Sequence, residues 1–78
     1  MQLTLPKAKI GYKYEIVEIR GQGIIKRRLL DMGLVPGEVL KVIGIAPLGD
    51  PIHIQVKGYD LSLRLSEASK IIVREVGK

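Results

Sequence analysis

Side chains that could carry out chemistry are few in this sequence, and they are spread along it. His53 is the only imidazole, cysteine is absent, and the carboxylates Asp50, Asp60 and Glu67 fall in separate predicted elements. Nucleophilic catalysis requires a nucleophile, a base within hydrogen-bond reach and a third group that orients the base. On a predicted strand, His53 has Gln55 as its same-face neighbour, not a carboxylate. We therefore predict that the chain is not an enzyme.

Metal binding would have to use the same few donors. The lack of cysteine excludes thiolate zinc sites and iron–sulfur clusters, and a single histidine excludes a multi-histidine site within one chain. Fe(II) accepts nitrogen and oxygen ligands, so His53 with an Asp or Glu could form at most a shallow surface site. We expect no firmly bound cofactor and at most weak binding of Fe(II) or another transition metal.

The length and composition describe one small basic domain. The chain has 78 residues, 46% of them hydrophobic, and 13 Lys plus Arg against 8 Asp plus Glu give a net charge of +5. A chain of this size forms one core and has little room for a deep cleft, so residues 1–78 are predicted to be a single domain. We find no signal-peptide pattern and no apolar run of membrane-spanning length. A soluble, cytoplasmic protein is expected.

Hydrophobic patterning predicts mostly strands. Residues 12–19 alternate as a strand whose phase changes at Val17, which indicates a bulge. Residues 21–32 have an apolar stripe at helical spacing, followed by a glycine and then by a Pro-Gly pair typical of a type II turn. Residues 38–46 form a second predicted strand, and 71–76 form the last one.

Residues 52–65 carry the clearest pattern, that of a β-hairpin. With Gly58 and Tyr59 as the two loop residues of a type II′ turn, the register places Ile54 opposite Leu63 and His53 opposite Arg64. One face is then aliphatic and the other polar, and a slip of one residue would mix them. After it, 66–70 is predicted to form one helical turn capped by Ser66. About five strands and one short inserted helix indicate a mainly β fold, a small closed SH3-like β-barrel, with an OB-fold as the nearest alternative.

Three segments of the sequence resemble those of one protein family. The order and spacing are those of the ferrous iron transport protein A (FeoA) family, over about residues 5–76. The matching pieces are the helix and turn RLLDMGLVPG at 28–37, the loop APLGDP at 46–51, and Lys57-Gly58-Tyr59, Leu63-Arg64, Glu67-Ala68 and Ile71 after it.

This resemblance implies both a fold and a function. Members of the family have an SH3-like barrel with an inserted helix and are small cytosolic proteins of prokaryotes. They work with ferrous iron transport protein B (FeoB), a membrane permease with a cytoplasmic G-domain, as adaptors or regulators of Fe(II) uptake. The same fold occurs as a C-terminal module of metal-dependent repressors. The expected partner is therefore this permease, which would hold the chain at the membrane.

The candidate contact surface is aliphatic. Loops on a rigid scaffold commonly carry binding residues, and an apolar Leu48 in a proline-framed loop could insert into a partner pocket. The alternative is that Leu48 closes the open end of the barrel as part of the core. The residues predicted to contact the partner are Leu34, Val35, Pro36, Pro47, Leu48, Gly49, Asp50 and Pro51.

Two other functions stay open at this point. The net charge of +5 is compatible with a nucleic-acid-binding barrel, although Tyr59 in the hairpin is the one expected exposed aromatic for base stacking, which makes that partner less favoured. A free-standing relative of the repressor module is the other alternative. Self-association through the aliphatic loops is also open.

Overall fold

The computed structural model describes all residues, 1–78. The elements in chain order are β1 (Gln2–Thr4), a 3₁₀ helix (Leu5–Lys7), β2 (Lys13–Ile19), α1 (Gly23–Asp31), β3 (Val39–Ile45), β4 (Ile52–Val56), β5 (Tyr59–Leu63), α2 (Leu65–Ala68) and β6 (Ile71–Gly77).

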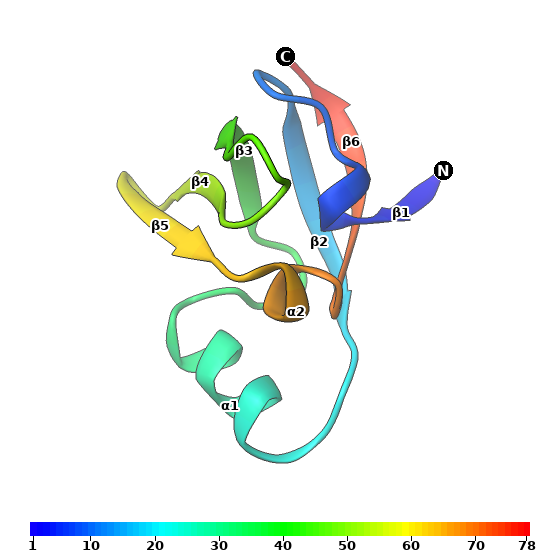
Figure 1. Cartoon of the computed structure of the whole chain (residues 1–78). Coiled ribbons are helices and arrows are strands. Elements are labelled where there is room, and N and C mark those ends of the chain that lie inside the picture. Colours follow the sequence, from blue (N-terminus) through cyan, green and yellow to red (C-terminus); the bar gives the residue numbers. More distant parts are fainter.

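The strands form one antiparallel sheet of six strands in the order β1-β6-β2-β3-β4-β5. The sheet is strongly coiled, with α1 at the end opposite the C-terminus and α2 between α1 and the strands (Figure 1). The predicted mainly β, SH3-like architecture with a short inserted helix is confirmed. Closure is not: β1 and β5 stand at the two ends of the hydrogen-bonded order, so the barrel is open between them.

One core fills the concave side of the sheet. Sixteen buried residues form a single cluster, and the largest side chains in it include Tyr14, Ile16, Leu29 and Leu34, each at most 1% exposed. Tyr14 keeps its hydroxyl satisfied, because that oxygen accepts a hydrogen bond from the Lys9 backbone N–H over 2.8 Å. No buried side-chain nitrogen or oxygen lacks a hydrogen-bond partner, so the few polar groups in the interior are all satisfied.

Local predictions around the helix are confirmed. The register of β2 on β6 shifts between Ile16 and Glu18, which is the bulge indicated by the phase change at Val17. Gly33 follows α1 with φ +90°, and Gly37 has φ +94° in a turn closed by the Glu38 N–H donating to the Val35 carbonyl over 3.0 Å. These glycines adopt the left-handed conformation that other residues avoid. The chain therefore leaves α1 and turns directly into β3.

The predicted register of the β4–β5 hairpin is wrong by two residues. The structure pairs Ile54 with Leu61 and His53 with Ser62, so the loop residues are Lys57 and Gly58, not Gly58 and Tyr59. Both loop residues have positive φ, 52° and 81°, as a type I′ turn requires. A shift of two keeps every side chain on its own face, so the aliphatic and polar faces are as predicted.

Two short elements differ from the sequence-based prediction. β1 was not predicted, because it has only three residues and a proline follows at position 6; it adds a sixth strand beside β6. The helical turn α2 begins at Leu65, so Arg64 and not Ser66 is its N-cap. Glu67 accepts a hydrogen bond from the Arg64 backbone N–H over 2.9 Å and thereby closes the first turn.

Candidate docking surface

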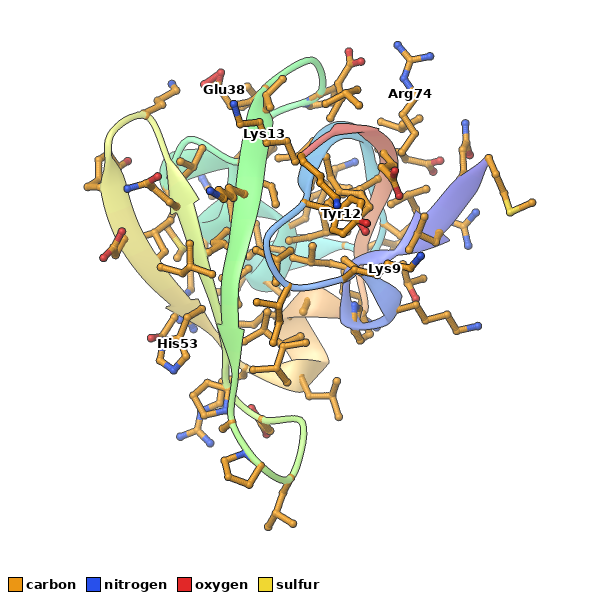
Figure 2. The ribbon with its side chains drawn as sticks, turned by 90° about the horizontal axis from the view of Figure 1, so that it is seen from above. Lys9, Tyr12, Lys13, Glu38, His53 and Arg74 are labelled. Atoms are coloured by element: carbon orange, nitrogen blue, oxygen red, sulfur yellow. The ribbon has the colours of Figure 1, made fainter.

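The loop between β3 and β4 presents Leu48 to solvent. The Gly49 N–H donates to the Ala46 carbonyl over 2.7 Å, and the Ala46 N–H donates to the Pro51 carbonyl over 3.0 Å. The first bond makes 46–49 a β-turn with Leu48 near its tip, where the side chain is 95% exposed. In Figure 2 this loop projects past the end of β3, away from the body of the sheet. Leu48 does not close the barrel as core.

A contact with α2 holds this loop in place. The Asp50 carboxylate accepts a hydrogen bond from the Leu65 backbone N–H over 3.0 Å. This joins the loop to the first residue of α2, and the side chain of Leu65 is itself 42% exposed. The apolar side chains of Leu48 and Leu65 therefore belong to two segments that are bonded together.

A shallow polar hollow lies next to this contact. It has a volume of about 380 Å³ and is lined by Asp50, Pro51, Ser62 and Arg64. None of the four ion pairs of the structure involves Arg64, so its guanidinium is free to meet an acceptor from outside. An exposed aliphatic tip beside an unpaired arginine suits a partner that offers an apolar pocket with a carboxylate or carbonyl at its rim. We define the docking corner as residues 46–51 together with Arg64 and Leu65.

The other predicted contact segment is not part of this corner. Leu34 is 0% exposed in the core, so including it among the contact residues is wrong. Its backbone N–H bonds to the Leu29 carbonyl over 3.1 Å, which turns the side chain back under the end of α1. Val35 and Pro36 are exposed, but they precede β3 whereas 46–51 follows it. A strand of seven residues separates the two segments by roughly 20 Å.

The structure adds two residues that the sequence reasoning left out. Arg64 and Leu65 enter the docking corner because β5 ends at Leu63 and α2 starts at once. The sequence reasoning treated both residues as strand. Glu67 three residues after Arg64, in the spacing of a capping box, was the signal that could have placed a helix start there.

His53 lies on the exposed face of the β4–β5 hairpin, at the left in Figure 2. Its Nδ1 is 2.9 Å from the Ser62 hydroxyl, and no carboxylate faces it in the register. The structure brings no three His, Asp or Glu side chains together in a way that could hold a metal ion. Weak binding of Fe(II) or another transition metal remains a prediction.

Lys26, Arg27 and Arg28 form a basic run on α1, and only Arg28 of the three makes an ion pair. Its guanidinium donates to the Glu67 carboxylate over 3.1 Å, while Lys26 and Arg27 are exposed and form no ion pair. Glu67 is the one charged residue among the buried ones, at 9% exposed. The run is therefore largely a solvated helix face, with one member tying α1 to α2.

The open, coiled sheet with its inserted helix and exposed loop defines a small SH3-like module that offers a surface and not a deep pocket. A model of the FeoA domain matches residues 3–75. The chain therefore belongs to the FeoA domain family, as the sequence segments predicted.

One curated relative is a ferrous iron transport protein. The chain is 37% identical over 71 residues to the Fe(2+) transport protein A/Fe(2+) transporter FeoB fusion protein of Porphyromonas gingivalis. The match covers 91% of this chain and only 8% of the fusion protein. The chain thus corresponds to only a small part of that relative.

Solved structures agree with this assignment. An FeoA-like protein from Clostridium acetobutylicum has a TM-score of 0.88 at 37% identity, covering 96% of this chain and 87% of that one. FeoA of Stenotrophomonas maltophilia, complexed with zinc, has a TM-score of 0.81 at 28% identity, covering 92% and 89%. The latter is described as a prokaryotic SH3 domain protein and a candidate activating factor of ferrous iron transport. In the present structure, neither helix has the length and apolar character needed to span a bilayer.

Proposed function

We propose that this chain is a cytoplasmic accessory protein of ferrous iron uptake that docks on the cytoplasmic part of an FeoB-type permease through the docking corner. The observation that carries the proposal is Leu48, a large aliphatic side chain held almost entirely in solvent on a closed loop. Exposing such a side chain does not stabilise the isolated fold. An exposed aliphatic side chain on a fixed loop is, however, typical of an anchor residue that fills a pocket of a partner. In this proposal the chain regulates the permease and has no catalytic step of its own.

Three features of the corner support a preformed contact. The two ends of the loop are joined by the hydrogen bond from the Ala46 N–H to the Pro51 carbonyl, and Asp50 bonds the loop to α2. Two prolines also restrict the backbone of the loop. Since little conformational freedom is left to lose on binding, most of the gain from burying Leu48 would appear as affinity. The free Arg64 would then set the orientation by donating hydrogen bonds to a carboxylate or carbonyl of the partner.

The choice of partner is supported by the curated relative. In the Porphyromonas gingivalis protein, a segment similar to this chain is joined to an FeoB transporter in one polypeptide. Domains that are fused in one organism commonly act on each other where they are separate. The proposal transfers that pairing to this chain as an association between two proteins.

The test is a binding measurement between the purified chain and the cytoplasmic domain of an FeoB-type permease. The variant Leu48→Asp is expected to weaken binding about 10- to 100-fold, because a buried leucine contributes about 1.5–3 kcal/mol. Ile24→Asp is the matched control, since Ile24 is 78% exposed on α1 and the substitution changes charge in the same way. Equal binding by the wild type and both variants would refute the docking corner as the contact surface. No binding by the wild type would refute docking on the permease.

A further inference from the structure

Five lysines gather on the side of the sheet where β2 begins. Lys13 on β2 and Lys41 on β3 are direct partners in the register. Both line a shallow hollow of about 210 Å³ together with Lys57. The ammonium groups of Lys9 and Lys78 lie over the ring of Tyr12, 5.6 and 5.3 Å from its centroid. We call this surface the lysine face; its members are Lys9, Lys13, Lys41, Lys57 and Lys78.

The positive charge of the lysine face is only partly compensated. Like charges directly opposite each other on neighbouring strands repel, and neither Lys13 nor Lys41 forms an ion pair. Lys57 is paired with Glu38 over 3.7 Å. The remaining nearby carboxylate on β2, Glu15, is taken by Arg74 over 2.7 Å. Glu75 and Asp60 are unpaired on the strands around the face, which still leaves an excess of positive charge.

An apolar tip stands among these charges. The Tyr12 N–H donates to the Lys9 carbonyl over 3.3 Å, and this closes a turn with Ile10 and Gly11 at its centre. Gly11 has φ +89°, and Ile10 is 55% exposed. The turn is fixed on β3, because the Gly11 N–H donates to the Val42 carbonyl over 2.7 Å. Figure 2 shows Lys13, Tyr12 and Lys9 in succession across the face turned to the viewer.

We propose that the lysine face is a binding surface for anionic lipid headgroups, with Ile10 inserting among the acyl chains. Lysine ammonium groups near an anionic bilayer are attracted to it, and an adjacent aliphatic side chain with a tyrosine is typical of a segment that sits at the bilayer interface. The turn is fixed on β3 next to the Lys13–Lys41 pair, so the apolar tip and these ammonium groups are held close together.

The same groups fit a nucleic acid less well. Tyr12 is only partly exposed and two ammonium groups already cover its ring, so it does not offer a free platform for a base. The face has lysines only, whereas arginine supplies the paired donors that phosphate and base edges prefer. An exposed isoleucine at the tip adds affinity for lipid and adds nothing to contact with a phosphate backbone.

This inference goes beyond docking on a permease and uses different residues. In Figure 2 the 46–51 loop projects from the rim of the face on which Lys13, Tyr12 and Lys9 lie. A chain seated on the bilayer by its lysine face would therefore keep Leu48 at the side, where a membrane protein could be reached. Because Leu48 lies outside the lysine face, its variants leave lipid binding unchanged, and the two ideas fail independently.

The test is co-sedimentation of the full chain with vesicles of phosphatidylcholine alone or mixed with phosphatidylglycerol. We expect binding to the mixed vesicles only, weakening as salt rises to about 0.15 M and beyond. Lys13→Gln with Lys41→Gln should lower the partition about 25-fold, since each lysine contributes about fivefold. Ile10→Ser should lower it by about three- to tenfold through lost apolar contact.

The matched control is Lys26→Gln with Arg27→Gln, which removes the same two charges from α1 at the other end of the molecule. This variant should partition almost as the wild type does. Equal losses in both double variants would overturn the proposal in favour of a net-charge effect, and absence of binding to mixed vesicles would overturn it outright. Tighter binding to single-stranded RNA with the same dependence on Lys13 and Lys41 would assign the face to nucleic acid. Displacement by inorganic phosphate at matched ionic strength would assign it to a small anion.

Discussion

The Arg28 guanidinium donates a hydrogen bond of 3.1 Å to the Glu67 carboxylate, and this contact joins α1 to α2. The two partners are unequal, because the Arg28 side chain is 64% exposed and that of Glu67 only 11%. Glu67 also accepts from the backbone N–H of Arg64 over 2.9 Å, at the start of α2. One carboxylate thus fixes both the helix that carries the basic run and the residue that lines the docking corner.

Replacing Glu67 should therefore cost more than replacing Arg28. Glu67→Ala removes both hydrogen bonds, including the one that caps α2, and should lower the free energy of unfolding by about 1–3 kcal/mol. Arg28→Ala removes one exposed partner and should cost less than about 1 kcal/mol. Urea unfolding of the two variants measures the difference, and a larger loss for Arg28→Ala would contradict this assignment of roles.

Leu34 and Leu48 offer a direct comparison of core and surface. Leu34→Ala leaves a cavity in the core and should cost about 2–5 kcal/mol, because Leu34 is 0% exposed. Leu48→Ala should change stability by less than about 0.5 kcal/mol, since Leu48 is 95% exposed. Thermal or urea unfolding tests this, and similar losses at the two sites would show that the loop folds back onto the core.

The hairpin shows how far pattern alone can predict. Alternation of apolar and polar residues determines the face of each side chain with a period of two, and both faces are as predicted within the strands 52–56 and 59–63. The same alternation is satisfied by registers two residues apart. The turn decides between them, and it places Lys57 with φ 52° at a position where glycine or asparagine would have been expected. A lysine gives no such signal.

Gly58 should be sensitive to any side chain. Its φ of 81° is strained for an L-residue, so Gly58→Ala should cost about 1 kcal/mol or more although the space around it is open. Gly44→Ala is the control, because Gly44 lies in β3 without a positive φ and an added Cβ would meet His53 at an ordinary 3.8 Å. Its expected change is within about 0.5 kcal/mol. Denaturant midpoints of the two variants decide, and equal values would refute the type I′ turn.

The composition of the candidate surface was predicted only in part. Loop 46–51 could be singled out from its prolines, glycine and aspartate, since these residues interrupt a strand, but the exposure of Leu48 came only from the structure. The pairing of this loop with Arg64 and Leu65 depends on where β5 stops, and the separation from Val35 and Pro36 depends on the length of β3. These are long-range relationships, and local pattern carries little information about them.

Asp50 should matter for the shape of the loop more than for the stability of the fold. Asp50→Ala removes the hydrogen bond to the Leu65 N–H and should lower backbone order parameters in 46–51. Asp60→Ala is the control, because Asp60 is also exposed, on β5, and makes no side-chain hydrogen bond or ion pair in the structure. Relaxation measurements by NMR compare them. Unchanged order in the Asp50 variant would mean that the prolines alone hold the loop.

The central claim is that the docking corner is where this FeoA-family chain meets its permease. A chemical-shift titration of the labelled chain with the cytoplasmic domain of an FeoB-type permease tests it most directly. We predict saturable shifts at 46–51, Arg64 and Leu65, with little change at Val35 and Pro36 at the other end of β3. Saturable shifts confined to residues elsewhere on the sheet, with the resonances of the docking corner unchanged, would contradict the claim, and so would the absence of any shifts.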